Sequence, residues 1–355
     1  MVNLKLSSAR LIPYRLGLTR PSVFGDERIG RLVRLETTGG HVGWGDAAPL
    51  PGFSRESIEM VDDDWKVLRP ALFRESLGGF DVPDPRTAIA SKFSTPALQF
   101  AIGQALVGLE SGRSGRPIPD VIAPGGPLKI RLAGLVTGSG AGAVESALHL
   151  AREGYTSMKI KVGRSALADD ITTTLDIRRA VGPDVNLRLD ANRAWSLDEA
   201  IRFVDETAAV APEFIEEPLA DPDQIERLVR MSGAPVALDE TILTISPNDL
   251  EAWSFATHVV LKPTLIGGMR VSEEFARAAR KAGMTPVLSG AYESGLGTAM
   301  LVCLAARLCP DGPPAGLDTY RRLDSDLLAQ RLPIGPETYL SDLSFEPKAD
   351  FNVRS

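Results

Sequence analysis

The sequence contains few of the residues that build disulfide frameworks, nucleic-acid surfaces or membrane spans. Among 355 residues there are only two cysteines, Cys303 and Cys309, and their spacing of six within a helix-like stretch indicates neither a disulfide framework nor a metal clip. The net charge of −7 provides no basic field for nucleic-acid phosphates. No apolar run is long enough to cross a bilayer, and residues 1–16 lack the apolar core of a signal peptide. These absences favour a cytoplasmic enzyme without a nucleic-acid or membrane partner.

Residues 1–123 are predicted to form an α+β capping domain. The stretches 4–18 and 28–49 alternate apolar and polar residues and break at Gly39–Gly40, which is typical of antiparallel strands. Residues 54–74 and 95–112 are predicted helices with Ser54 and Thr95 as N-caps. The stretch 112–127 is rich in Gly and Pro and is predicted to be a linker. We expect the tail, 321–355, to pack back on this domain.

Residues 124–320 are predicted to form an α/β fold, a modified TIM barrel of (β/α)7β type. From about Lys129, short apolar segments alternate with helix-length amphipathic ones. The strand candidates are IRLAGLV, TSMKIKV, VNLRLDAN, EFIEEPL, PVALDE, HVVLKP and TPVLSG, and AGLDTY is the candidate for the last strand. Strict βα alternation implies parallel strands, and seven or eight units imply a closed barrel. A doubly wound sheet is the alternative, but no Gly-rich dinucleotide turn follows an early strand.

Charged residues lie near the C-terminal ends of successive predicted strands. They are Lys159 and Lys161 on the second strand, Asp190 on the third, Glu216 on the fourth, Asp239 on the fifth and Lys262 on the sixth. Active sites of such barrels are built at this end. Residues two apart on a strand share a face, so Lys159 and Lys161 point the same way. One charged strand end is easily explained as a solvated loop residue, but six at one period are not.

Three carboxylates on adjacent strands can converge on one hard cation. Oxygen ligands favour Mg²⁺, Mn²⁺ or Ca²⁺ over zinc, and without a cation the carboxylates would repel one another. The expected cofactor is Mg²⁺, with Mn²⁺ as the alternative. A cation and neighbouring ammonium groups lower the pKa of a lysine and make it a base usable near neutral pH. This chemistry suits removal of a proton α to a carboxylate, because the metal stabilises the enediolate. The expected partner is a small-molecule carboxylate substrate.

Five segments resemble the barrel signatures of the enolase superfamily and occur in the order expected for that family. They are MKIKVG (158–163), LRLDANRAW (187–195), FIEEPL (214–219), ALDET (237–241) and VLKPTLIGG (260–268). GWGDAAPLPGFS (43–54) resembles a loop of its capping domain. The lysines on strands two and six resemble the pattern of the muconate-lactonizing-like subgroup. LRLDANRAW, LKPTLIGG and SGAYESGLGTAML are most similar to the o-succinylbenzoate synthases of that subgroup.

The resemblance implies a role for each strand-end residue. Asp190, Glu216 and Asp239 match the metal ligands. Lys161 matches the base, Lys159 would lower its pKa and help to hold the substrate carboxylate, and Lys262 matches the lysine on the opposite face. Asn192 and Glu240 are expected around the metal ligands, although a purely structural role is equally compatible with the sequence. Of the adjacent pair in FIEEPL, Glu216 rather than Glu217 is expected to face the barrel axis.

The resemblance also implies a reaction, the syn-dehydration of 2-succinyl-6-hydroxy-2,4-cyclohexadiene-1-carboxylate in menaquinone biosynthesis. Lys262 would stabilise the intermediate by a cation–π contact. An N-acylamino acid racemase is the alternative, since Lys161 and Lys262 would supply bases on both faces. A dipeptide epimerase is disfavoured, because AGLDTY offers only Asp318, and Tyr320 stands where a second aspartate is usual. A non-catalytic ligand-binding barrel would have lost a ligand or a lysine, and none is lost.

Four residues are candidates for substrate contact. Ser289 and Gly290 either present backbone N–H groups to a substrate carboxylate or form a tight βα turn. Arg20 either meets a distal carboxylate or is a solvated surface residue, and the same two alternatives apply to Arg28 at the other end of the cap loop TRPSVFGDER. Phe53 either packs on the substrate or anchors its loop. The sequence leaves the oligomeric state open and allows a homo-oligomer.

Overall fold

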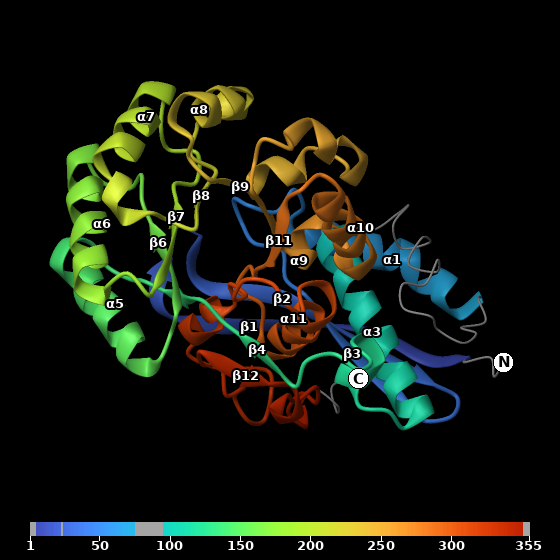
Figure 1. Ribbon diagram of the computed structural model, residues 1–355. Coiled ribbons are helices and arrows are strands. Elements are labelled where there is room, and N and C mark those ends of the chain that lie inside the picture. Colours follow the sequence, from blue (N-terminus) through green and yellow to red (C-terminus); the bar gives the residue numbers. More distant parts are fainter. Residues whose placement is uncertain (1–4, 23, 75–94, 351–355) are drawn as a thin grey trace.

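An antiparallel sheet and helices form one side of the molecule. The computed structural model describes residues 5–22, 24–74 and 95–350. The sheet contains β1 (Leu6–Ser22), β2 (Gly25–Thr37) and β3 (Val42–Ala47) in that order, and α1 (Ile58–Arg74) and α3 (Pro96–Ser114) pack on it (Figure 1). The predicted antiparallel strands are confirmed. The first helix begins at Ile58, so Ser54 is not its N-cap, and Thr95 occupies the N-cap position of α3 without a side-chain capping bond.

The GWG stretch of β3 lies directly against α3. A Cβ atom on Gly43 or Gly45 would lie 1.8 Å from the carbonyl oxygen of Ala105 or Ala101, respectively. Glycine is therefore required here by the close approach of strand and helix backbones, since any side chain would push them apart.

We expect Gly45→Ala to lower the free energy of unfolding by more than about 2 kcal/mol, because the backbone of α3 cannot make room for the methyl group without moving. Gly142→Ala, within α5 (Gly140–Glu153), is the matched control, since a Cβ there meets no atom within 4 Å. That change should stabilise the helix by about 0.5 kcal/mol. Urea denaturation of both variants measures the difference, and equal stabilities would show that the β3–α3 contact tolerates a side chain.

A parallel sheet curls into the predicted barrel. In the described part of the chain it has seven strands in sequence order: β5 (Gly134–Leu135), β6 (Ser157–Lys161), β7 (Asn186–Asp190), β8 (Phe214–Glu216), β9 (Val236–Leu238), β10 (His258–Leu261) and β11 (Thr285–Leu288). Parallel bridges from Ala315 to Leu132 and from Gly316 to Ser289 close the gap between the outer strands. The (β/α)7β prediction is confirmed, although AGLDTY contributes these two bridges and a 3-10 turn (Asp318–Arg322) rather than a full strand.

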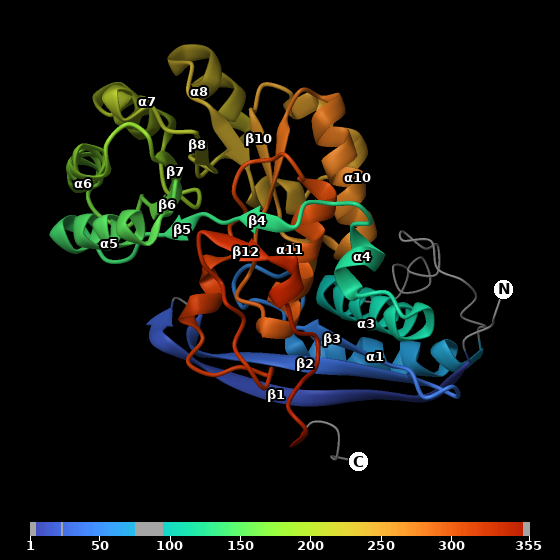
Figure 2. The ribbon, with the colours of Figure 1, turned by 60° about the horizontal axis from the view of Figure 1, so that its bottom comes forward.

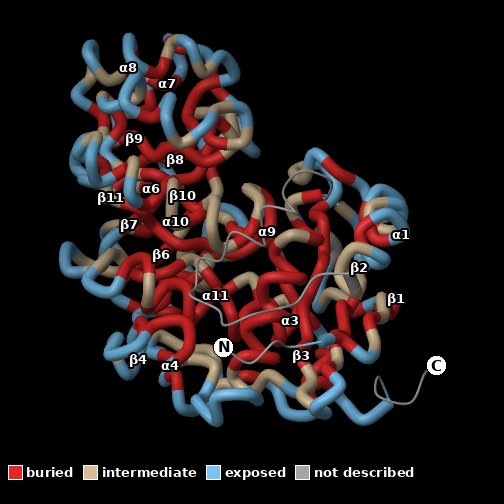
Figure 3. Tube along the Cα trace, turned by 90° about the vertical axis from the view of Figure 1, so that its right-hand side faces the viewer, coloured by how far each residue is buried: buried red, intermediate tan, exposed pale blue. Residues whose placement is uncertain are grey.

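Helices surround this sheet. They are α5, α6 (Leu167–Val181), α7 (Leu197–Glu206), α8 (Ile225–Ser232), the short α9 (Pro263–Ile266), α10 (Gly268–Lys281) and α11 (Gly295–Leu308). Figure 3 shows the strands as buried and the outer turns of α7 and α8 as exposed. Cys303 and Cys309 are both free and buried at α11. No helix among residues 5–22, 24–74 and 95–350 is long and apolar enough to cross a membrane.

The inside of the barrel is apolar below the strand ends. Phe214, Ala237, Val260 and Val287 are buried and pack together. Each lies two residues before a strand-end residue, namely Glu216, Asp239, Lys262 or Ser289. Because residues two apart share a face, those four strand-end side chains also face the barrel axis. An apolar floor therefore supports the polar groups above it.

The C-terminal segment runs between the barrel and the antiparallel sheet (Figure 2). β12 (Glu337–Tyr339) pairs antiparallel with β4 (Lys129–Arg131), and Leu323 forms a bridge to Leu18 of β1. The predicted linker 112–127 is wrong in part, because α4 (Ile118–Ile122) forms inside it with prolines at its start, where a missing N–H costs nothing. The predicted domain boundaries at residues 123 and 320 stay predictions, and residues 351–355 lie outside the described part.

Candidate active site

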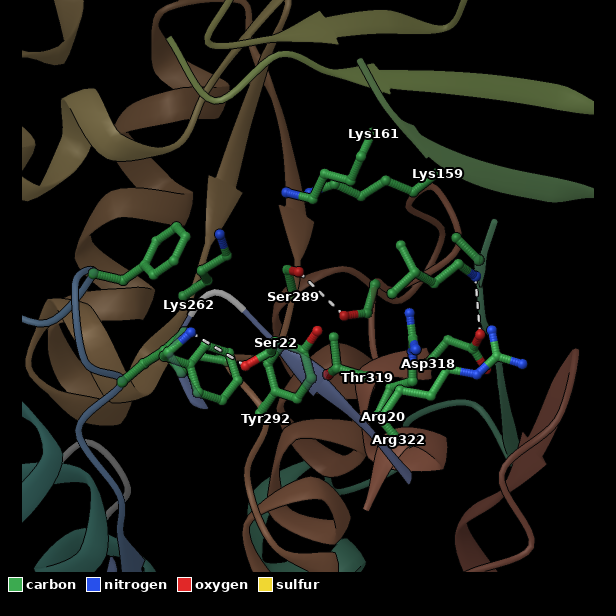
Figure 4. Close-up of a pocket in the computed structure, with 18 of the residues that line it drawn as sticks. Arg20, Ser22, Lys159, Lys161, Lys262, Ser289, Tyr292, Asp318, Thr319 and Arg322 are labelled. Atoms are coloured by element: carbon green, nitrogen blue, oxygen red, sulfur yellow. Dashed lines mark hydrogen bonds between the residues drawn. The ribbon is translucent and has the colours of Figure 1, made fainter. Parts of the chain in front are cut away.

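A cavity of about 170 Å³ opens where the C-terminal ends of the barrel strands meet the antiparallel sheet. Lys159 and Lys161 of β6 reach across it toward Lys262, and Ser289 lies near their ammonium groups (Figure 4). The cavity is also lined by Arg20, Ser22, Phe24, Leu50, Phe53, Ala133, Leu135, Arg164, Gly290, Ala291, Tyr292, Gly316, Asp318, Thr319 and Arg322. The structure thus brings together the predicted lysines and the predicted substrate-contacting residues from regions far apart in the sequence.

The lysines are bound to the predicted metal-ligand carboxylates. Strand register places Lys161 beside Asp190, and Asp190 beside Glu216. Lys159 Nζ lies 2.5 Å from Asp190 Oδ2 and donates to both oxygens of Glu216 at 2.8 Å. Lys161 donates to Asp190, and Lys262 donates to Asp239. The three carboxylates are buried, so each depends on these cationic partners for compensation.

The three lysines differ in how strongly they hold their protons. Burial lowers the pKa of Lys161, and the ammonium groups of Lys159 and Lys262 lower it further, against the opposing effect of Asp190. For Lys159 the lowering effect of burial is outweighed by Asp190 and Glu216, so its pKa is raised. The pKa of Lys262 is raised in the same way, chiefly by Asp239. Lys161 is therefore the lysine most readily deprotonated, and its side chain is also the most exposed of the three at 25%.

The carboxylate cluster fits a hard divalent cation by its chemistry. Burial and the charges of Asp190 and Asp239 raise the pKa of Glu216 to about 8, because buried carboxylates that lie close together repel one another when all are ionised. Oxygen donors of this kind suit Mg²⁺ or Mn²⁺. Within the described residues, no three acidic, His or Cys side chains are arranged so that they could hold one metal ion. Lys159, Lys161 and Lys262 donate to oxygens of the three carboxylates. Cation binding therefore requires that some of these ion pairs be exchanged.

Glu216 and Glu217 have different surroundings. Glu216 faces the lysines, whereas Glu217 is fully buried and accepts hydrogen bonds from the backbone N–H groups of Asp239 and Thr241, at 2.8 and 2.7 Å. The Glu217 backbone has a φ of 41°, a strained value for a residue with a side chain. Arg193 Nε also donates to Glu217 at 3.0 Å. Glu217 thus fixes the backbone at Asp239 rather than facing the cavity.

Asn192 and Glu240 extend the polar cluster. Asn192 accepts a hydrogen bond from Lys161 Nζ at 2.7 Å and donates to Glu240 Oε1 at 3.0 Å. The other oxygen of Glu240 is buried and has no hydrogen-bond partner among the described residues. The pKa of Glu240 is raised, mainly by burial. Asn192 therefore orients the candidate base directly, and Glu240 adds negative charge beside Lys262.

The interpretation of Ser289 and Gly290 as N–H donors to a substrate is wrong. The N–H of Ser289 donates to Leu261 O at 2.8 Å, and that of Gly290 donates to Gly316 O at 3.0 Å. The Ser289 N–H continues the pairing of β11 with β10, and the Gly290 N–H helps to close the barrel, so both are already used within the βα connection. The two residues still line the cavity with their other atoms.

The arginines of the cap loop have two different environments. Arg20 is exposed at the cavity rim, and Arg28 is buried, so the idea that Arg28 is solvated is wrong. Arg164 and Arg322 also line the cavity, and sequence reasoning missed them. Arg164 directly follows MKIKVG at a strand end, and this position could have identified it as a cavity residue. Phe53 packs with other apolar cavity residues, which leaves substrate contact and loop anchoring both open.

Asp318 and Tyr320 are held by neighbouring residues. Asp318 accepts a hydrogen bond from Leu135 N at 2.9 Å and from Tyr155 at 3.1 Å. Tyr320 is buried and donates to Asp326 at 2.5 Å. Asp318 lines the cavity but is already bound, so this segment presents no pair of free carboxylates to a cationic ligand.

Comparisons with known proteins assign the family. The family described as Enolase C-terminal domain-like matches residues 142–334. The o-succinylbenzoate synthase of Enterobacter sp. (strain 638) is 31% identical over 360 residues, which cover 96% of this chain and 99% of that protein. The chain belongs to the enolase superfamily. Within that superfamily it is muconate-lactonizing-like and o-succinylbenzoate-synthase-like, and its membership makes it an enzyme. The chloroplastic protein PHYLLO of Arabidopsis thaliana is 28% identical over 94% of this chain, but the chain spans only 22% of that longer protein.

Solved structures share the fold at lower identity. An N-succinyl Arg/Lys racemase from Bacillus cereus ATCC 14579 has a TM-score of 0.85 and 20% identity, covering 98% of this chain and 96% of that one. A dipeptide epimerase from Enterococcus faecalis V583, complexed with Mg and the dipeptide L-Leu-L-Tyr, has a TM-score of 0.85 and 21% identity over 97% and 98%. A mandelate racemase/muconate lactonizing enzyme from Roseiflexus sp. has a TM-score of 0.84 and 23% identity, covering 98% of this chain and 99% of that one. These likenesses support the barrel fold and leave the reaction open.

Proposed function

We propose that the protein is an o-succinylbenzoate synthase, a hydro-lyase that dehydrates 2-succinyl-6-hydroxy-2,4-cyclohexadiene-1-carboxylate. The observation that carries the proposal is the 31% identity to the o-succinylbenzoate synthase of Enterobacter sp. (strain 638), which covers 96% of this chain and 99% of that protein. Lys161, whose pKa is lowered mainly by burial, is the candidate base for this reaction.

Each charged residue of the cavity has its own role in the proposed reaction. Lys161 removes the proton from the ring carbon that carries the carboxylate, and the electron pair passes into that carboxylate to give an enediolate. The C–O bond to the ring hydroxyl then breaks on the same face, the proton held by Lys161 leaves with it as water, and the ring becomes aromatic. Lys262 and Lys159 remain charged and stabilise the anion. Asp190, Glu216 and Asp239 would hold Mg²⁺, which supplies electrostatic stabilisation of the enediolate when bound.

The charge of the cavity suits a substrate with two carboxylates. Arg20, Arg164 and Arg322 join the three lysines around it, and their side chains make no hydrogen bond or ion pair with any described residue. Unpaired arginines at the rim can bind the distal carboxylate of a succinyl group. The epimerase alternative is weakened further, because Asp318 already holds Leu135 and Tyr155.

We expect Arg20→Met and Arg322→Met each to raise KM about tenfold with little change in kcat, because the distal carboxylate is bound equally in the ground and transition states. Arg15→Met is the matched control, since this exposed arginine of β1 pairs with Glu27 away from the cavity. Steady-state kinetics with the cyclohexadiene precursor measure the effect. A loss of kcat at unchanged KM would place these arginines in the chemical step instead.

The test of the proposed function is incubation of the protein and Mg²⁺ in D₂O with the precursor and, separately, with N-succinyl amino acids. A synthase forms the aromatic product from the precursor. Rapid α-deuterium exchange and racemisation of N-succinyl amino acids, without any dehydration, would favour the racemase alternative suggested by the fold neighbours. No turnover and no exchange with any of these compounds would contradict both.

A further inference from the structure

Arg28 of β2 is an almost fully buried cation that binds backbone rather than a carboxylate. Its side chain is 1% exposed and takes part in no ion pair with a described residue. Nη1 donates to Pro49 O at 2.8 Å and Nη2 to Ala48 O at 2.7 Å, both just after β3. Nε donates to Tyr292 O at 3.0 Å and Nη2 to Ala291 O at 3.4 Å, both just after β11. One guanidinium therefore joins a loop of the antiparallel sheet to a loop of the barrel.

Both loops form the apolar wall of the cavity. Leu50 and Phe53 follow the first pair of acceptors, and Ala291 and Tyr292 belong to the second. These four side chains pack into one cluster with Phe24, whose ring meets Tyr292 edge-on at 4.9 Å between centroids. The guanidinium carbon of Arg28 lies 5.8 Å from the centre of the Phe24 ring. The wall thus consists of three chain segments that share Arg28 as a common contact.

The arrangement depends on the shape of arginine. A guanidinium presents five donors in a fixed planar fork and stays charged, whereas a lysine ammonium has three donors at one point and cannot reach four carbonyl groups in two directions. Tyr292 has a φ of 62°, a value that a residue with a side chain keeps only when its surroundings hold it. Arg28 binds the carbonyl of this strained residue and so helps to hold its ring at the cavity.

We propose that Arg28 is a positioning residue that assembles the apolar wall of the substrate cavity from the loops 48–53 and 290–292. It does not touch the reacting atoms and acts through the loops that it holds. The kinetic part of the inference rests on the proposed function, whereas the structural part does not. Its test therefore uses loop opening as well as catalysis.

The experiment compares Arg28→Lys with Arg34→Lys by amide hydrogen exchange. Arg34 is also a buried arginine of β2, but it binds Glu36 and contacts neither loop. The reporting amides are Leu50, Phe53 and Ser54 in one loop and Ala291 in the other, because each is hydrogen-bonded within its loop. We expect exchange in both loops to rise about tenfold in Arg28→Lys and to stay at the wild-type rate in Arg34→Lys. Unchanged exchange, or a rise in one loop only, would overturn the proposal.

Catalysis supplies the second measurement. Arg28→Lys should raise KM for the precursor about tenfold and change kcat by less than about threefold, since the wall positions substrate without entering the chemistry. An equal rise in Arg34→Lys would show a general loss of stability and contradict a role in positioning. If the wild-type protein does not dehydrate the precursor, the proposed function fails, and the exchange experiment still decides the role of Arg28. If Arg28→Lys does not fold, wild-type exchange decides instead, because amides of two loops that open together must show one common opening free energy once their intrinsic exchange rates are taken into account, and different opening free energies would overturn the proposal.

Discussion

Replacing Lys161 by alanine is expected to lower kcat for dehydration by about 10³-fold, the contribution of a well-placed general base. Its amine is bound by Asp190 and Asn192, and burial together with Lys159 and Lys262 lowers its pKa. No other described group in the cavity combines this position with a lowered pKa. Steady-state kinetics at saturating Mg²⁺ measure the loss, and the melting temperature verifies that the barrel remains folded.

The Lys161→Arg variant distinguishes proton removal by residue 161 from an effect of its positive charge alone. Arginine retains the cation but does not give up its proton near neutral pH, so it cannot serve as a base. We expect this variant to be as inactive as Lys161→Ala. Substantial activity in Lys161→Arg would show that residue 161 acts only through its charge, and the base would then have to be sought elsewhere.

Replacing Glu216 by glutamine is expected to weaken divalent-cation binding by more than about 100-fold, since loss of groups that merely support a metal ligand already costs up to about that much. Glu216 is buried, and burial together with the charges of Asp190 and Asp239 raises its pKa to about 8, so its ionised form depends on nearby positive charge. Titration with Mn²⁺, followed by electron paramagnetic resonance, measures the affinity. Activity should fall with it and recover in part at high Mg²⁺.

Glu213→Gln is the matched control for this change. Glu213 lies at the other end of the same strand, where it binds the buried Arg188 at 2.7 Å. Removing its charge should cost about 3–5 kcal/mol of stability, because a buried guanidinium loses its partner, but should leave Mn²⁺ affinity unchanged. Wild-type affinity in Glu216→Gln would contradict the ligand assignment, and an equal loss in both variants would point to general distortion of the barrel.

The sequence predicts the barrel and the cluster of charged residues for one physical reason. Parallel strands alternate with helices at a nearly constant spacing, so residues at equivalent strand ends must meet on one face of a closed sheet. Lys161, Asp190 and Glu216 satisfy this rule, and strand register places them side by side. Alternation places Glu216 and Glu217 on opposite faces, and the family resemblance then selects Glu216 as the residue that faces the barrel axis.

Other features depend on contacts between distant segments and cannot be read from local pattern. The N–H groups of Ser289 and Gly290 look available in the sequence, but in the fold they donate to the carbonyls of Leu261 and Gly316. Arg28 lies in an alternating strand like other surface arginines, and only the folded chain brings the carbonyls of Pro49 and Tyr292 to its guanidinium. The sequence pattern gives the strand on which such a residue lies, and tertiary contacts decide its role.

The central claim is that Lys161 removes a proton from the carbon next to the substrate carboxylate. The most direct measurement is a single-turnover experiment that compares the cyclohexadiene precursor with the same compound deuterated at that carbon. We predict that the deuterated precursor gives o-succinylbenzoate more slowly with the wild-type protein and that Lys161→Ala converts both compounds about 10³-fold more slowly than the wild-type protein does. Equal rates for the two compounds, together with conversion by Lys161→Ala, would contradict proton abstraction by this lysine.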